Sequence, residues 1–430
     1  MNEEEYRMSR EVTDWMNIAQ CFYWSNERLL QFSQQFSAEI ERVLAGQPSS
    51  LQAVKSYLAL PTGREQGTYL ALDFGGTNVR VSRIRLLGHH CFIVEKKISR
   101  PLKKDGEYNY MTAQTTADEL FDFIADLVGE AAGGNKPFYL GHTFSFGVAQ
   151  HDVGDARFLQ WSKEITVAGA EGRMVNDMLR QALVRKGLDD IIPVALLNDT
   201  TALLLAAGYQ HGQSQVGIIC GTGFNMCYYE PRWDMIVSLE AGGYDGMART
   251  NWDIAVDEAS QQPGYHQLEK MVSGAYLSEI YRRVAMEYLE AESMPPFTTE
   301  AMNHIVANDS PAEGRLLMGR VWKRIVALQD VKPLRSIGAA VFVRSAQLTG
   351  ASCFGVLRHL YPDGAIPAQT IAVEGSVLEH VRGSLFMLED ALHICQAGFA
   401  RGKKIEASPV LVKDGPSVGA AIAAAMAAHH

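Results

Sequence analysis

Apolar runs separated by polar breaks predict strands that alternate with helices along this chain. The stretch 68–98 is strand-like, and short apolar runs at 138–144 and 194–197 predict buried strands. This alternation, with a hairpin at the start of each half, predicts an α/β fold of two related domains. Further strands are expected at 371–373 and 410–412, and helices at 9–44, 117–128, 175–183, 201–209, 267–290, 312–328, 341–360, 384–400 and in the alanine-rich tail.

Two short glycine turns carry most of the chemical information. Gly75-Gly76-Thr77 and Gly221-Thr222-Gly223 each follow an apolar run and lead into a second strand-like run. Glycine in such a hairpin supplies a positive φ or allows close approach of the backbone. Exposed backbone N–H groups beside a threonine hydroxyl also form a nest for phosphate oxygens. One such hairpin is commonly just a turn, but a pair predicts two similar halves that grip one nucleotide.

Composition limits the class of protein. With 430 residues, 47% hydrophobic and 20% charged, the chain is expected to form two globular domains. A net charge of -10 argues against nucleic acid as a partner. The six cysteines show no CxxC spacing, which disfavours a structural zinc site. The acidic start Met1-Asn2-Glu3-Glu4-Glu5 is unlike a signal peptide, and no apolar stretch is expected to span a membrane, so a cytoplasmic location is expected.

The order of several motifs resembles that of the hexokinase family, the eukaryotic-type hexose kinases of the actin-like ATPase fold. Each motif alone is weak, and their shared order carries the resemblance. The matching segments are 70–78 (LALDFGGTN), 140–146 (LGHTFSF), 161–163 (WSK), 194–200 (VALLNDT), 221–225 (GTGFN) and 268–274 (LEKMVSG).

The resemblance implies a two-domain, ribonuclease H-like α/β fold with a central cleft between the domains. The small domain is expected at 62–198 and is joined by the C-terminal helix 416–428. The large domain is expected at 1–61 and 199–415. The implied reaction transfers the γ-phosphoryl group of ATP to the 6-hydroxyl of a hexose, most simply glucose, as the entry to glycolysis.

Asp199 is the candidate general base. It follows a buried strand at the start of a helix, where a carboxylate is able to accept the proton of a sugar hydroxyl. The alternative is that Asn198 or Asp199 only caps the helix. Asp73 ends the first strand beside the phosphate turn, which suits coordination of Mg²⁺ through water, although a turn-initiating Asp is its simpler role. Arg80 is equally a candidate phosphate neighbour and a surface residue.

The resemblance also implies the ligands of the two substrates. Lys163 is additionally expected to stabilise charge on the phosphoryl group in flight. The sugar ligands implied are Ser145, Ser162, Lys163, Asn198, Asp199, Asn225, Glu240 and Glu269. The ATP ligands implied are Asp73, Gly75, Gly76, Thr77, Asn78, Arg80, Gly221, Thr222, Gly223, Gly375, Ser376, Gly415 and Ser417.

The chain departs from the family pattern most at the donor end. Residues 414–419 read Asp-Gly-Pro-Ser-Val-Gly where the family usually has Asp-Gly-Ser-Gly-Lys-Gly, and Glu374 replaces a usual Asp. These changes leave the phosphoryl donor open. At the sugar end Gly147, Ser162, Glu164-Ile165 and Ala241 replace the usual Pro, Thr, Gly-Phe and Trp, which leaves the preferred hexose open.

Three alternatives stand beside a hexose kinase. A non-sugar actin-like ATPase would explain both glycine hairpins, but it would give the polar residues between Ser145 and Glu269 no role. A catalytically weak sugar sensor would fit the altered tail, although Asp73 and Asp199 are intact. A bacterial-type glucokinase of the repressor-related class would carry a clustered-cysteine zinc motif, which this sequence lacks.

Overall fold

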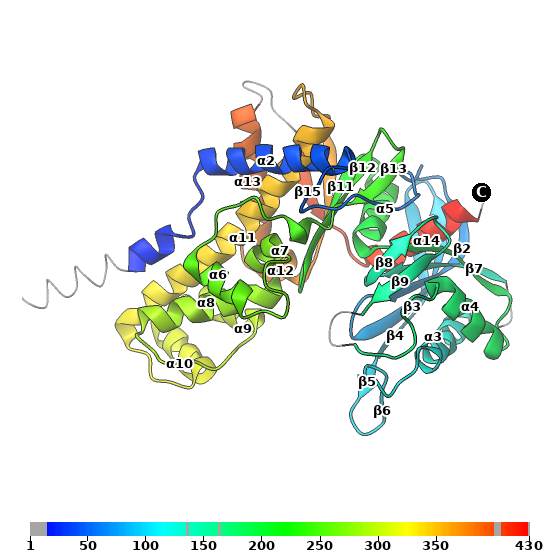
Figure 1. Ribbon diagram of the computed structural model, residues 1–430, viewed down its shortest axis with the longest axis horizontal. Coiled ribbons are helices and arrows are strands. Elements are labelled where there is room, and N and C mark those ends of the chain that lie inside the picture. Colours follow the sequence, from blue (N-terminus) through cyan, green and yellow to red (C-terminus); the bar gives the residue numbers. More distant parts are fainter. Residues whose placement is uncertain (1–14, 135–136, 162–164, 400–405, 429–430) are drawn as a thin grey trace, which may run out of the picture.

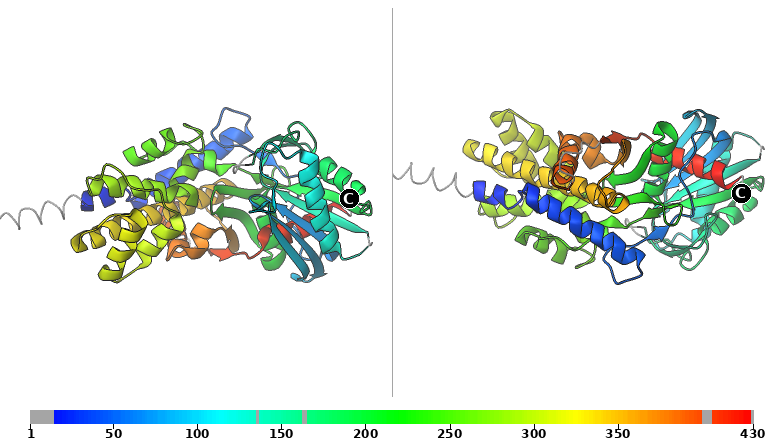
Figure 2. Two further views of the ribbon diagram at one scale, coloured as in Figure 1. Left: turned by 90° about the horizontal axis from the view of Figure 1, so that it is seen from below. Right: turned by 90° about the horizontal axis from the view of Figure 1, so that it is seen from above.

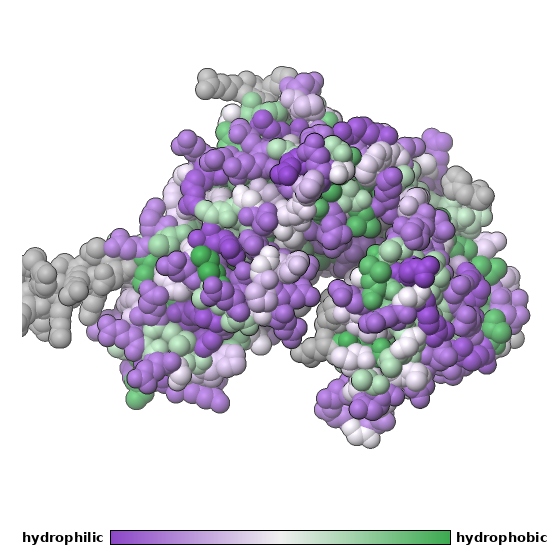
Figure 3. Space-filling model, in the orientation of Figure 1, coloured by the Kyte–Doolittle hydropathy of each residue, from purple (hydrophilic) through white to green (hydrophobic). Residues whose placement is uncertain are grey.

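The computed structural model describes residues 15–134, 137–161, 165–399 and 406–428. Its two main sheets have five and six strands, and each is covered by helices (Figure 1). The five-stranded sheet lies toward one end of the molecule, and the long helices beyond the six-stranded sheet fill the other end (Figures 1 and 2). The surface is hollowed between the two parts, at the lower centre of Figure 3.

The five-stranded sheet contains the first predicted hairpin. Its order is β10-β7-β2-β3-β4, with β2 antiparallel to β3 and parallel to β7. Two helices, α3 and α4, pack on one face, and α3 begins with a capping box between Thr116 and Glu119. The bounds are β2 Gln66–Phe74, β3 Asn78–Gly88, β4 Cys91–Pro101, α3 Ala117–Ala132, β7 Phe138–Phe144, α4 Val175–Arg185 and β10 Ile191–Leu197.

The six-stranded sheet contains the second predicted hairpin. Its order is β1-β13-β12-β11-β14-β15, with β11 antiparallel to β12 and parallel to β14. Both hairpins therefore form as predicted, β2–β3 in the five-stranded sheet and β11–β12 in the six-stranded sheet. The bounds are β1 Val54–Lys55, β11 Ser214–Cys220, β12 Phe224–Glu230, β13 Met235–Ser238, β14 Gln369–Glu374 and β15 Ala407–Leu411.

Two helices form the layer between the sheets. α5 (Asp199–His211) packs on β11 and on α14 (Gly415–Ala427), and α14 packs on β2 and β7. Every residue from Thr200 to Tyr209 is buried, as expected for a helix covered on all sides. Glycines allow these elements to pack closely. A Cβ added at Gly141 would lie 1.9 Å from the Ala420 carbonyl oxygen, and one added at Gly419 would lie 1.9 Å from the Ala202 carbonyl oxygen.

Some of the remaining helices contact the six-stranded sheet, among them α7, α11, α12 and α13, whereas α8, α9 and α10 pack on other helices. The longest, α11, packs against α2 and α13. Their bounds are α2 Asn26–Leu44, η1 Ala241–Gly243, α6 Asn251–Glu258, α7 Gln267–Val272, α8 Gly274–Tyr288, α9 Thr299–Ala307, α10 Pro311–Trp322, η2 Leu328–Asp330, α11 Val331–Leu360, α12 Ser376–His380 and α13 Ser384–Phe399. Two small sheets pair β5 Lys103–Lys104 with β6 Tyr108–Asn109, and β8 Gly147–Gln150 with β9 Ala156–Gln160.

Several predicted helix limits were wrong. The helix predicted over 9–44 is interrupted after residue 20, and α2 starts anew behind the N-cap Ser25. The helix predicted over 312–328 ends at Trp322, because Lys323 adopts a left-handed conformation. The predicted helix 267–290 is divided at Ser273, whose extended backbone separates α7 from α8. Helix α11 begins ten residues before the predicted start at 341.

The expectation that no apolar stretch reaches membrane-spanning length was also wrong. The helical stretch Leu328–Leu360 is long and apolar enough by length and composition, with a mean hydropathy of 1.3. However, 83% of its apolar window is buried inside the protein, where α2 and α13 cover it. Packing in the protein core therefore explains why this helix is apolar.

Candidate active site

The first glycine turn connects β2 and β3 beside the sugar segment. Neither Gly75 nor Gly76 has a positive φ, so the glycines are not needed for a left-handed turn. Close approach explains Gly75, since an added Cβ would lie 2.8 Å from Ser145 Oγ. An added Cβ at Gly76 would meet no atom within 4 Å, so its backbone faces open space. Thr77 is exposed, and its carbonyl accepts a hydrogen bond from the Leu102 N–H.

Asp73 and Arg80 face each other across this hairpin. Arg80 Nη1 lies 2.9 Å from Asp73 Oδ2, and the Asp73 side chain is nearly buried. In the absence of ligands, Arg80 therefore forms an ion pair with Asp73 and is not simply a solvated surface residue. Asn78 begins β3, where its Nδ2 lies 3.4 Å from Thr77 Oγ1.

The second glycine turn connects β11 and β12 and is fixed by α8. The N–H groups of Gly274 and Ala275 donate to the carbonyls of Gly221 and Thr222. Gly221 and Gly223 also lack a positive φ. An added Cβ at Gly223 would lie 2.9 Å from Glu269 Oε2, so close approach again explains the glycine. The predicted reason of positive φ was therefore wrong for both turns, and the predicted alternative of close approach was right at two of the four glycines, Gly75 and Gly223.

Three predicted sugar ligands gather beside this second turn. Asn225 Nδ2 lies 3.0 Å from Glu240 Oε1, and Ser238 Oγ lies 2.9 Å from the same oxygen. Glu269 Oε2 accepts the Phe224 N–H at 2.9 Å. Burial, opposed by these hydrogen bonds, raises the pKa of Glu240. The carboxylates are thus held in place by the protein's own donors.

The other predicted sugar ligands lie on the side of the five-stranded sheet. Ser145 follows β7, its N–H donates to the Phe74 carbonyl, and its Oγ is buried without a hydrogen-bond partner in the described structure. This hydroxyl is therefore available to a ligand beside the first turn. Ser162 and Lys163 lie outside the described residues, as does Glu164.

Asn198 is the N-cap of α5, and Asp199 is its first residue. Asn198 Oδ1 accepts the Thr200 N–H at 2.9 Å, so the capping interpretation is correct for Asn198. Asp199 Oδ1 also lies 2.8 Å from this N–H. Burial raises the pKa of both Glu240 and Glu374, and the charge of Asp199 adds to each shift. Asp199 therefore interacts electrostatically with one sugar candidate and with one donor segment.

Two donor segments, 374–376 and 414–417, contain the predicted ATP ligands near the C-terminus. The first packs against the second turn, and the second forms the start of α14. Gly375 has a φ of 116°, and an added Cβ would lie 2.4 Å from the Cys220 carbonyl, so only glycine fits there. Ser376 is exposed beside Gly221. Gly415, the first residue of α14, packs so closely that an added Cβ would lie 2.7 Å from Glu374 Oε2. Ser417 is buried in the first turn of α14.

Glu374 is the centre of an acidic group drawn from distant parts of the chain. Its Oε2 is buried without a hydrogen-bond partner in the described structure. Burial, followed by the charges of Asp73 and Asp199 and then of Glu379 and Asp414, raises the pKa of Glu374 to about 8. Lys97 Nζ on β4 lies 2.5 Å from Asp414 Oδ1. The first turn, the candidate base and the tail segment therefore converge on one place.

Sequence reasoning missed the central residues of this acidic group as site residues. Glu374 and Asp414 directly precede the predicted ATP ligands Gly375 and Gly415, and in the sequence they stand out only as parts of motifs that depart from the family pattern. The available signal was an acidic residue immediately before each glycine. No pattern in the sequence indicated that Lys97 would reach Asp414 across 317 positions.

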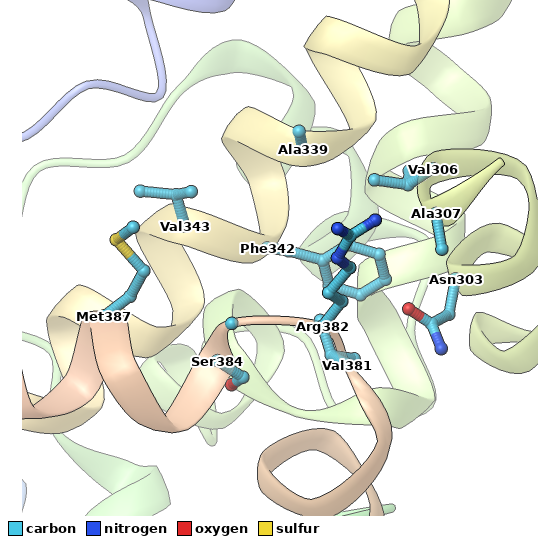
Figure 4. A pocket seen from close by; sticks show the side chains of 11 residues that line it. Asn303, Val306, Ala307, Ala339, Phe342, Val343, Val381, Arg382, Ser384 and Met387 are labelled. Atoms are coloured by element: carbon cyan, nitrogen blue, oxygen red, sulfur yellow. The ribbon is translucent and has the colours of Figure 1, made fainter. Parts of the chain in front are cut away.

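A separate cavity of about 120 Å³ lies in the helical part, lined by residues of α9, α11 and the start of α13 (Figure 4). Asn303 and Arg382 lie at one side of it, and Val343 and Met387 at the other (Figure 4). The Asn303 side chain donates to the His380 carbonyl at 3.1 Å. None of the predicted site residues lines this cavity.

Comparison with known families and proteins gives consistent matches over nearly the whole chain. Two family models, both described as hexokinase, match residues 14–209 and 215–426. Hexokinase-2 of Candida albicans is 28% identical over 95% of this chain and 91% of its own. Hexokinase-2 of Oryza sativa subsp. japonica is 31% identical over 93% of this chain and 88% of its own.

Solved structures agree with these matches. A crystal structure of a hexokinase superposes with a TM-score of 0.86 at 27% identity, covering 98% of this chain and all of its own. A hexokinase from Schistosoma mansoni, solved in complex with glucose, superposes with a TM-score of 0.82 at 25% identity, covering 97% of this chain and 99% of its own. The predicted two-domain α/β fold of actin-like ATPases is thereby confirmed. The domain boundaries at 61/62 and 198/199 stay predictions.

Proposed function

The chain belongs to the hexokinase family, and from that premise we propose that it transfers the γ-phosphoryl group of ATP to the 6-hydroxyl of a hexose, with glucose the expected sugar. The relatives it matches are named hexokinases, and one similar structure holds glucose. The proposed reaction leads into glycolysis.

One observation carries this proposal. The charge of Asp199 acts on Glu240 among the sugar candidates and on Glu374 among the donor segments. A general base for phosphoryl transfer must contact the attacking hydroxyl while the donor phosphate lies in line with it. The electrostatic contact of Asp199 with both groups supports its assignment as this base.

The proposed step needs no covalent intermediate on the protein. The 6-hydroxyl oxygen forms a bond to the γ-phosphorus, the bond from phosphorus to the bridging oxygen of ADP breaks, and the hydroxyl proton passes to the Asp199 carboxylate. Phosphoryl transfer depends on positioning and charge neutralisation. Asn225, Glu240 and Glu269 would orient the sugar, together with Ser145. Lys163 remains a proposed partner of the transferring group.

The nucleotide would lie between the two glycine turns. The open space over Gly76 supports close approach of a phosphate to the backbone there. The left-handed Asp414 and the start of α14 support a polar donor contact in the tail segment.

Mg²⁺ fits this site only with help from the nucleotide. Among the described residues, no group of three or more His, Cys, Asp or Glu side chains is arranged to hold a metal ion. Mg²⁺ commonly takes one or two carboxylates, several waters and substrate phosphates. Asp73, paired with Arg80 and near Glu374, would contact the ion through water. When bound, the ion would neutralise charge on the β- and γ-phosphates.

The test is a variant that keeps the shape of Asp199. In Asp199→Asn, hexose binding should persist while the turnover number falls by roughly 10²- to 10⁴-fold, because the base is gone. Asp390→Asn, an exposed position on α13, is the matched control and should retain full turnover. Normal turnover in Asp199→Asn would end the assignment of the base.

A second measurement separates the kinase from a sugar sensor. A coupled assay with glucose, fructose, mannose and glucosamine, against ATP and other nucleoside triphosphates, should show ADP formation that depends on one of the hexoses. Sugar-induced thermal stabilisation without ADP formation would support the sensor instead, and stabilisation by nucleotide alone would support a non-sugar ATPase.

A further inference from the structure

The residue after the predicted sugar ligand Glu269 forms a buried ion pair. Lys270 Nζ lies 2.6 Å from Asp257 Oδ1 and also donates to the Gln262 carbonyl at 2.7 Å. Arg249 Nη1 lies 3.1 Å from the other oxygen of Asp257. The Lys270 and Asp257 side chains are only 4% and 9% exposed. A buried ion pair adds little net stability, because the loss of water around its charges offsets their attraction. Its more direct effect is to fix the elements that carry the two charges.

Helix α7, which carries Glu269 and Lys270, is held from two sides. It is six residues long, so its position depends on contacts with its surroundings. Successive side chains of a helix point about 100° apart. Glu269 Oε2 accepts the Phe224 N–H at 2.9 Å beside the second turn, whereas Lys270 reaches Asp257 on α6. The carboxylate at the sugar site and the buried ammonium therefore fix the same short helix.

The carboxylate of Asp257 also fixes the segment between α6 and α7, residues 259–266. The Gly264 N–H donates to both Asp257 oxygens, at 3.0 and 3.1 Å, and Gly264 has a φ of 84°. Because Lys270 holds the Gln262 carbonyl, the segment is tied to the ion pair at two points. It leads directly into α7 and so sets where that helix begins.

We propose that Lys270 is a positioning residue of the sugar site, and that its ion pair with Asp257 fixes α7 and the segment 259–266 so that Glu269 presents its carboxylate to the hexose. This inference rests on the proposed function and deepens it. Hydrogen bonds to a sugar hydroxyl depend on distance and angle, so a displacement of α7 by about 1 Å would weaken them strongly. Lys270 acts through Glu269 and does not itself contact the sugar.

The test is Lys270→Met, which keeps an unbranched side chain but removes its charge and its hydrogen bonds. Titration of the whole protein with glucose, without nucleotide, should show an affinity roughly 10- to 100-fold lower than that of the wild type, because Glu269 is no longer held in place. The KM for glucose should rise by a similar factor, while kcat stays within about threefold and ADP affinity within about twofold. Lys332→Met, exposed at the start of α11, is the matched control and should behave as the wild type.

Hydrogen exchange measured by mass spectrometry locates the effect. The backbone amides of 259–272 should exchange faster in Lys270→Met than in the wild type, while those of β2 and β7 should not change. Saturating glucose should return this segment toward the wild-type rate, because the bound sugar holds Glu269. A loss of protection spread over the whole six-stranded sheet would instead show a general loss of stability and would overturn the inference.

A second variant keeps the inference testable if Lys270→Met does not fold. Asp257→Asn keeps the shape of the side chain and removes one charge of the pair, so it should weaken glucose binding roughly 3- to 10-fold. Unchanged glucose affinity in either folded variant would overturn the inference. Hexose-dependent ADP formation by the wild type would leave the proposed function standing in that case, whereas its absence would remove both.

Discussion

The proposed active site has a sugar end, formed by Asn225, Glu240 and Glu269, and a donor end, formed by Asp73, Glu374 and Asp414. At the sugar end each carboxylate accepts hydrogen bonds from the protein, from Asn225 and Ser238 to Glu240 and from the Phe224 N–H to Glu269. At the donor end the acids lie near one another, and Glu374 Oε2 is buried without a described partner.

This difference indicates which part of the site is ready before a substrate arrives. Half-buried acids with protein donors are fixed in place, and a sugar needs such fixed groups because its hydroxyls are recognised by hydrogen bonds. At the donor end Arg80 and Lys97 pair with Asp73 and Asp414, whereas Glu374 Oε2 has no described donor and is surrounded by negative charge. A nucleotide brings Mg²⁺ with it, which would neutralise that charge. The sugar end is therefore organised by the chain itself, whereas the donor end is completed by its ligand.

The largest effect is expected on the free energy of unfolding, at Glu374 of the donor end, where burial and neighbouring negative charges disfavour the ionised carboxylate. The pKa of Glu374 is about 8 against an ordinary 4.5, so its contribution to stability is present below pH 4.5 and is lost as the pH rises through 8. Glu374→Gln should raise the free energy of unfolding at pH 9 by on the order of 3 kcal/mol, with no gain at pH 4.

Thermal unfolding of the ligand-free protein across this pH range measures the effect. Glu300→Gln, exposed on α9, provides the control for loss of one negative charge. An equal gain at pH 4 and pH 9 would show that the donor end is not destabilised by charge and would remove the contrast between the two ends.

A smaller effect is expected at the sugar end. Glu240→Gln should weaken hexose binding by about 2 kcal/mol, or roughly 30-fold, because a charged acceptor is lost from a buried hydrogen-bond group. Nucleotide binding should remain within about twofold of the wild type, since this carboxylate belongs to the other end. Separate titrations with glucose and with ADP check the prediction, and a parallel loss of ADP affinity would show that the ends are not independent.

The smallest effect is expected for the water-mediated ion contact. Asp73→Asn should raise the Mg²⁺ concentration for half-maximal activity by roughly 10-fold, since a partner of the ion is weakened but no direct ligand is lost. Hexose affinity measured without nucleotide should not change. A shift in hexose affinity of similar size would instead assign Asp73 to the support of the sugar end, through Gly75 and Ser145.

Much of the local structure could be predicted because short-range physics decides it. The apolar runs on both sides of Gly75-Gly76-Thr77 and Gly221-Thr222-Gly223 form hairpins as expected, and the order of the motifs identified the family. Helix limits were less certain. The end of α10 depends on a left-handed Lys323, and the break before α2 depends on a cap at Ser25, neither of which interrupts the apolar pattern.

The sequence by itself determined the two hairpins, the alternation of strands and helices, and the types of residue that carry the chemistry. Only the tertiary structure decided which of these residues meet. Asp73, Asp199, Glu374 and Asp414 come from four separate segments, and their charges interact because α5 and α14 bring the two sheets together. The hydrogen bond from the Phe224 N–H to Glu269 arises in the same way, from the packing of α7 on β12. Electrostatic interaction depends on distance in space, which periodicity along a chain does not encode.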